Sequence, residues 1–64
     1  MTVYIIALVI GGVLDTLLGF AIKEKALAWV EEHAKLYNYH KDNEDHWTSI
    51  DEDDDMTLWE VKIE

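Results

Sequence analysis

The sequence predicts an α+β fold in which one helix packs on one face of a small antiparallel sheet. Three observations support this prediction: two apolar runs separated by Gly11-Gly12, a middle segment with helical periodicity, and a closing segment of alternating apolar residues. The order is ββαβ, or ββαββ if a short segment near residue 47 is also a strand. Residues 1–64 contain no internal repeat and no linker rich in Pro or Gly, so we expect a single domain.

The two apolar runs, residues 3–10 and 13–20, are rich in β-branched and aromatic side chains, which favour strands. A Gly-Gly pair between two such runs is typical of a two-residue hairpin turn. With Gly11 and Gly12 as the whole turn, both faces of the hairpin are apolar. This register places on one face the pairs Ile10 with Val13, Leu8 with Asp15, Ile6 with Leu17, and Tyr4 with Gly19.

The segment KEKALAWVEEHAKLY, residues 23–37, predicts an amphipathic helix with one apolar and one charged face. Residues 38–55 are expected to form an acidic loop, because residues 38–46 follow no period and DEDDD favours an exposed turn. Within this segment WTSI is the candidate short strand. The closing strand is expected over residues 56–63, where Trp59, Val61 and Ile63 share a face.

Charge is distributed unevenly along the chain. The formal net charge is −9, and ten of the fourteen acidic residues lie in residues 38–64. Because Arg is absent as well, direct binding to nucleic acid is disfavoured, and a partner with a basic surface is favoured. The absence of Cys excludes disulfides and most structural zinc sites. It suits a reducing cytoplasm, and no basic residue precedes the apolar run as in a secretory signal, so we expect a cytoplasmic protein.

No motif in the sequence supports catalysis, a cofactor or a bound metal. Asp51, Asp53 and Asp55 match the first ligand positions of an EF-hand calcium loop, but Met56 stands where the loop needs Gly and Lys62 where it needs Glu. The three His residues lack a zinc-ligand spacing, and there is no glycine-rich phosphate loop or nucleophile elbow. We therefore expect a binding protein without a cofactor, and no enzyme.

Four short segments, MTVYII, LLGFA, KEKALAWVEEH and LWEVKIE, resemble a recurrent type of very small acidic phage-encoded protein. The resemblance spans most of the chain. It departs from that type at Ile22, where such sequences often have Ser or Thr, and at the short apolar connection between the first two strands. The resemblance implies a host-takeover or anti-defence protein, located in the cytoplasm of the host cell, that binds and blocks a bacterial protein.

Some proteins of that kind imitate DNA, with carboxylates where phosphates would lie. The candidate surface for such binding is the acidic segment with the two Trp residues that flank it, because aromatic side chains are enriched at binding hot spots. The predicted partner-binding residues are Asp42, Glu44, Asp45, Trp47, Asp51, Glu52, Asp53, Asp54, Asp55 and Trp59.

Both apolar faces of the hairpin need to be shielded from water, and the predicted helix can pack on only one of them. We expect a homodimer to shield the other, with Ile6, Leu8, Ile10, Val13 and Leu17 at its interface. The alternative is a single-span membrane protein with a cytoplasmic acidic tail, in which residues 3–22 cross the bilayer as one helix. That stretch is long enough, but Asp15 near its middle is costly in lipid.

Overall fold

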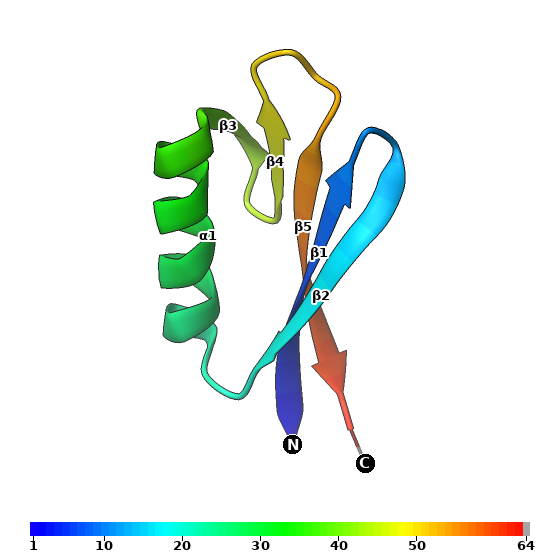
Figure 1. Cartoon of the computed structure of the whole chain (residues 1–64). Helices are drawn as coiled ribbons and strands as arrows, with labels where there is room; N and C mark the ends of the chain where they lie inside the picture. The colour runs from blue at the N-terminus through cyan, green and yellow to red at the C-terminus, as the bar shows by residue number, and fades with distance from the viewer. Residues whose placement is uncertain (64) are drawn as a thin grey trace.

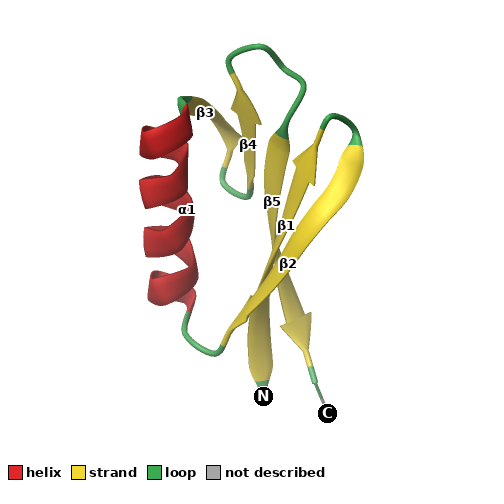
Figure 2. Cartoon of the chain, in the orientation of Figure 1, coloured by secondary structure: helices red, strands yellow, loops and turns green. Residues whose placement is uncertain are grey.

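The computed structural model describes residues 1–63, in which five antiparallel strands form one sheet and one helix packs against it (Figures 1 and 2). The α+β fold predicted from the sequence is confirmed. The strand order is β2-β1-β5-β4-β3, so that β1, β5 and β4 have neighbours on both sides and β2 and β3 are the edge strands. The elements are β1 (Thr2–Ile10), β2 (Val13–Phe20), α1 (Lys23–Tyr37), β3 (Tyr39–Asn43), β4 (His46–Ser49) and β5 (Asp55–Lys62).

The turn between β1 and β2 consists of Gly11 and Gly12, as the sequence predicts. Both glycines have positive φ angles, 59° and 80°, which a two-residue hairpin turn requires and which side chains disfavour. The two pairs next to the turn, Ile10 with Val13 and Val9 with Leu14, follow the predicted register.

Beyond these pairs the predicted register is wrong by one residue, because β2 contains a bulge at Asp15. Leu8 pairs with Thr16, and Ile6 pairs with Leu18 where Leu17 was expected. A bulge places an extra residue on one strand and so changes which later side chains share a face with the neighbouring strand. As a result Leu18 lies on the helix-covered face and Leu17 on the opposite one.

The helix α1 packs on the sheet through a stripe of small side chains. Ala26, Val30 and Ala34 are buried and lie four residues apart, so that they fall on one side of the helix. At the C-terminal end Asn38 adopts the left-handed conformation, with φ 60°, and its backbone N–H donates to the carbonyl oxygen of Ala34. Ile22 at the N-terminal end forms no side-chain cap, in line with the poor capping residue in the sequence.

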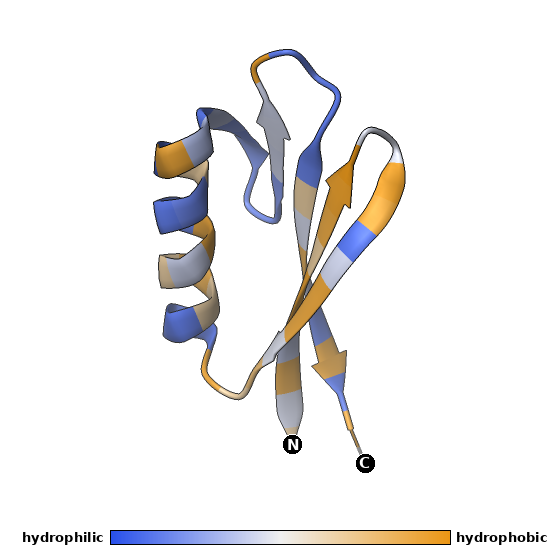
Figure 3. Cartoon of the chain, in the orientation of Figure 1, coloured by the Kyte–Doolittle hydropathy of each residue, from blue (hydrophilic) through white to orange (hydrophobic). Residues whose placement is uncertain are grey.

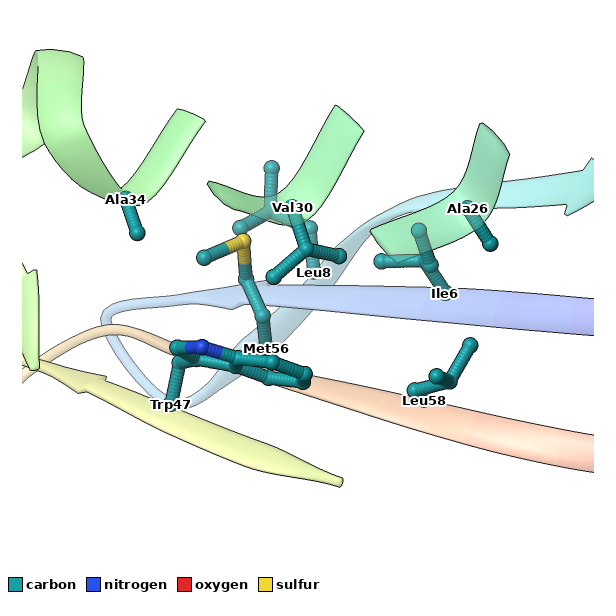
Figure 4. Close-up of a cluster of buried hydrophobic side chains, with 8 residues drawn as sticks. All are labelled: Ile6, Leu8, Ala26, Val30, Ala34, Trp47, Met56 and Leu58. Atoms are coloured by element: carbon teal, nitrogen blue, oxygen red, sulfur yellow. The ribbon is translucent and has the colours of Figure 1, made fainter. Parts of the chain in front are cut away.

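The core lies between α1 and the central strands (Figure 4). Met56, Val30 and Ile6 are its largest fully buried side chains. Trp47 of β4 lies beneath Met56 and is only 3% exposed. The eight buried apolar residues are Ile6, Leu8, Ala26, Val30, Ala34, Trp47, Met56 and Leu58.

Two sequence predictions about surface residues are therefore wrong. Ile6 and Leu8, predicted at a dimer interface, are 0% and 6% exposed because α1 covers their side of β1. Trp47, predicted to contact a partner, is in the core for the same reason. The sequence pattern could not decide which apolar face of the hairpin the helix covers, since both faces are apolar.

The expected acidic loop over residues 38–55 is interrupted by two strands: β4, which corresponds to the candidate short strand WTSI, and β3, which was not predicted. Residues 39–43 form the edge strand β3, which joins β4 through a short turn (Figure 2). Side-chain contacts stabilise this polar strand: Asn43 Oδ1 accepts from the backbone N–H of Asp45 at 3.0 Å, and Lys41 Nζ lies 5.6 Å from the centre of the Trp47 ring. These contacts leave no trace in the periodicity of the sequence.

Candidate acidic binding site

Most acidic residues of the C-terminal half lie on the two connections that flank β4. Glu44 and Asp45 form the β3–β4 turn, and residues 50–54 form the β4–β5 loop. Figure 3 shows these hydrophilic segments beside the mostly hydrophobic β1–β2 hairpin. Of the predicted partner-binding residues on these two connections, Glu44, Asp45, Asp51, Glu52 and Asp53 are exposed, in positions from which they can meet a partner.

Hydrogen bonds fix the conformation of the β4–β5 loop. Ser49, which is 6% exposed, donates from Oγ to Asp51 Oδ1 at 2.6 Å and accepts from the backbone N–H of Asp54 at 3.1 Å. The Ser49 hydroxyl, aided by the backbone N–H of Asp53, lowers the pKa of the Asp51 carboxyl below its ordinary value. The loop therefore presents ionised carboxylates at defined positions.

The same loop is attached to the β1–β2 turn. The backbone N–H of Gly11 donates to Asp54 Oδ1 at 2.9 Å, across 43 residues of sequence. Figure 1 shows the two connections at the same end of the molecule. This contact places the acidic loop beside the tip of the apolar hairpin, a neighbourhood that the sequence does not indicate.

A second polar cluster lies on the sheet face opposite α1, where His46 bridges two carboxylates. Its Nδ1 is 2.9 Å from Asp42 Oδ2, and its Nε2 is 2.9 Å from Asp55 Oδ2. Asp42 also accepts from the Thr48 hydroxyl and lies 3.1 Å from His40 Nε2. Only a protonated imidazole can donate from both nitrogens, so the geometry favours the charged form of His46.

The cluster shifts the pKa values of its members in opposite directions. The hydrogen bond to Asp55 raises the pKa of His46, with a smaller contribution from Asp42. The Thr48 hydroxyl, together with His40 and His46, lowers the pKa of Asp42. Asp42 and Asp55 are thus engaged with histidine side chains of the chain, whereas the carboxylates of Asp51 and Asp54 in the β4–β5 loop accept hydrogen bonds from uncharged groups.

The His46 bridge predicts a pH dependence of stability. A raised His46 pKa stabilises the fold fully below its ordinary value of about 6.5, and this contribution is lost as the pH rises through the folded-state pKa. The lowered pKa of Asp42 contributes above about 3.8 and is lost as the pH falls through its folded-state value. The bridge should therefore be strongest between these two limits.

The measurement is urea unfolding of the wild type and of His46→Gln between about pH 5 and pH 9. We expect the difference in free energy of unfolding between them to shrink as the pH rises. Only this difference is informative, because burial lowers the pKa of His33. His33 therefore makes the free energy of unfolding increase with pH in both proteins. A difference that is constant across this range would contradict the bridge.

An open cleft of about 770 Å³ lies on the helix side of the sheet, next to the acidic loop. It is bounded by the C-terminal end of α1, the tip of the β1–β2 hairpin and the β4–β5 loop. Its apolar lining comes from Leu8, Ile10 and Ile50, and its carboxylates come from Asp15, Asp51 and Asp54.

Aromatic side chains form the helix side of this cleft. The ring centre of His33 is 4.6 Å from that of Tyr37 and 5.5 Å from that of Tyr39, and the Trp29 ring stacks on its other side at 4.9 Å. The pKa of Tyr39 is raised first by burial and then by Asp54, Asp55 and Asp51. The carboxylates therefore make the electrostatic potential at this wall negative.

Sequence reasoning missed most residues of the cleft. Asp51 and Asp54 are among the predicted partner-binding residues, but Asp15, Tyr37, Tyr39, Ile10 and Ile50 were not assigned to such a site. They come from five elements, namely β1, β2, α1, β3 and the β4–β5 loop, and the bulge sets the position of Asp15. The one available signal was the pair Tyr37 and Tyr39, which flanks the residue that ends the helix.

A broad apolar surface lies on the sheet face opposite α1, which we call the open face. Leu17 and Trp59 are its most prominent members, 60% and 59% exposed. Trp59, predicted to bind a partner together with the acidic segment, is exposed, and it lies on the open face. The open face comprises Val3, Ile5, Ala7 and Val9 of β1, Leu14 and Leu17 of β2, and Trp59 and Val61 of β5.

Residues 3–22, considered above as one membrane-spanning helix, form the β1–β2 hairpin and the short connection from β2 to α1. Across residues 1–63, none of the helical structure is long and apolar enough to cross a membrane. In the same part of the chain no group of three or more His, Asp or Glu side chains is placed to hold a metal ion. Comparisons with protein-family models, with curated proteins and with solved structures gave no match for this chain.

Proposed function

We propose that this chain is a small acidic inhibitor that binds a basic surface of a bacterial protein and blocks it, as the resemblance to phage-encoded proteins implies. The target would be a nucleic-acid-binding protein in the cytoplasm of the host cell. Clusters of Lys and Arg that bind phosphates also attract carboxylates, so an acidic surface can compete with DNA for them.

The observation that carries this proposal is the fixed conformation of the β4–β5 loop. A mobile acidic segment would lose conformational entropy when it binds, whereas a loop already fixed by Ser49 and by the Gly11 backbone loses little. Asp51, Glu52 and Asp53 remain exposed in that conformation. The loop is therefore suited to an electrostatic partner more than to a purely solubilising role.

The proposal includes a homodimer, with the interface moved to the open face. Large apolar side chains remain uncovered there, with Leu17 and Trp59 60% and 59% exposed. A basic partner surface does not match an apolar sheet face, but a second copy of the same face does. A dimer would also leave both acidic loops available to a target.

The test is competition with DNA for a basic bacterial DNA-binding protein that has no sequence preference. We expect the chain to release a fluorescent duplex from that protein at low salt, and to lose this effect steeply as salt rises. Replacing Asp51, Glu52 and Asp53 by Asn, Gln and Asn should raise the concentration needed for release by about tenfold or more. Fluorescence anisotropy measures the release.

The matched control replaces Glu24, Glu31 and Glu32 of α1 by Gln, which removes the same number of charges from another exposed surface. This variant should keep most of the activity. If both triple variants lose activity equally, net charge alone is responsible and the loop is not the binding surface. If the unmodified chain fails to release DNA at low salt, DNA mimicry is wrong.

A further inference from the structure

The cleft beside the acidic loop has the size and the lining of a ligand site. Its volume of about 770 Å³ falls within the range of about 300–1,000 Å³ that is usual for binding clefts. Three separate parts of the chain border it, and the hydrogen bond from the Gly11 backbone N–H to Asp54 joins two of them. The cleft is thus part of the fixed structure.

The cleft combines two chemically different parts. Ile10 and Ile50, 46% and 73% exposed, offer aliphatic surface, and the exposed Tyr37 and half-buried Tyr39 offer aromatic surface. Surfaces of this kind pack well against the methylene stem of a long side chain. A small inorganic cation would make no use of them.

The negative charge of the cleft favours a positively charged group at the end of the bound side chain. Asp15, Asp51 and Asp54 reach the cleft from β2 and from the β4–β5 loop, and among the described residues that line it none is Lys or Arg. The C-terminal end of α1 is at the same place, where the helix dipole favours positive charge. His33, which lines the cleft from α1, has its pKa lowered by burial and so opposes this potential little.

We propose that this cleft binds a lysine or arginine side chain of the basic partner, with its stem against Ile10, Ile50 and the tyrosines and its charged group among Asp15, Asp51 and Asp54. The inference rests on the proposed function and makes it more specific. The exposed loop attracts the partner over a distance, and the cleft fixes one of its side chains. Such an anchor gives an orientation that a diffuse acidic surface lacks.

The experiment is an NMR titration of backbone amides with a capped tetralysine peptide as the probe. We expect the largest chemical-shift changes in the cleft, at Asp15, Tyr39, Ile50 and Asp54. The same peptide with acetylated lysine ε-amines keeps the stems but lacks the charges, and it should not produce these changes. Equal shifts with the acetylated peptide would overturn the inference.

Two double variants with the same loss of charge separate the cleft from the general acidity of the chain. Asp15→Asn with Asp51→Asn removes two carboxylates from the cleft, and each asparagine keeps one side-chain oxygen that can accept the hydrogen bond from Thr16 or from Ser49. Glu44→Gln with Asp45→Asn removes two from the β3–β4 turn. We expect the first to weaken tetralysine binding by about fivefold per carboxylate and the second by less than about twofold.

The outcomes distinguish this inference from the proposed function. If the peptide shifts the amides of both acidic connections equally, and both double variants weaken it equally, the cleft is not the anchor while the acidic surface remains a binding surface. If the peptide shifts no amide at low salt, the inference and the proposed function both fail. The dispersed amide spectrum of each variant verifies that it is folded.

Discussion

Replacing Ile6 by Ala is expected to lower the free energy of unfolding by about 2–5 kcal/mol. The side chain is fully buried between β1 and α1, in contact with the core that Met56 and Val30 form. Its removal leaves a cavity that the surrounding sheet cannot fill. Urea unfolding followed by circular dichroism measures the change.

Val13→Ala is the matched control, since the uninterrupted register predicted from the sequence placed Ile6 and Val13 on the same face. Val13 is 69% exposed, so its replacement should cost less than about 1 kcal/mol. A chain of this size has a total stability of only about 3–10 kcal/mol, so Ile6→Ala could fail to fold. In that case Ile6→Val replaces it in the comparison with Val13→Ala, with an expected loss of about 0.5–1.5 kcal/mol in the free energy of unfolding. Similar costs at residues 6 and 13 would contradict the observed core.

Replacing Leu17 by Glu is expected to convert a dimer into a monomer. Leu17 is 60% exposed on the open face, where a second copy would desolvate the new carboxylate without a partner for it. A residue central to such an interface contributes about 2 kcal/mol or more, so the dissociation constant should rise by at least about tenfold. Analytical ultracentrifugation at micromolar concentrations and moderate salt measures it.

Leu36→Glu is the matched control for this change. Leu36 is 69% exposed, but it lies on α1, away from the open face. It adds the same charge and removes a leucine of similar exposure, so the dimer should persist. A wild-type chain that sediments as a monomer throughout the micromolar range would rule out the dimer, and a Leu17→Glu dimer would place the interface elsewhere.

Local features of the sequence were sufficient to predict the helix and the hairpin turn. The period of residues 23–37 and the pair Gly11-Gly12 act over a few neighbouring positions, and the structure follows them. The polar strand β3 could not be predicted, because it depends on cross-strand contacts with β4 and on the bond from Asp45 to Asn43.

The candidate site was predictable only in part. The composition of residues 50–55 indicates an acidic connection, and the structure places one there. The cleft could not be predicted, because it requires the loop to meet the tip of the hairpin and the end of α1. The burial of Trp47 could not be predicted either. Alternating apolar residues show that a strand has two different faces, but they do not show which face the helix covers.

The bulge at Asp15 determines which side chains in the second half of β2 lie under the helix. After the bulge the strand continues Thr-Leu-Leu-Gly-Phe. Because of the extra residue, Thr16, Leu18 and Phe20 lie on the side of the sheet that the helix covers. If Asp15 instead paired with Leu8, without a bulge, Leu17 would take the place of Leu18 opposite Ile6 with little effect, since both are leucine. The same change would also bring Gly19 beneath the helix in place of Phe20 and leave a void there. A change of register would therefore cost little packing in the middle of β2 and much more at its end, where Phe20 would be lost from the helix side.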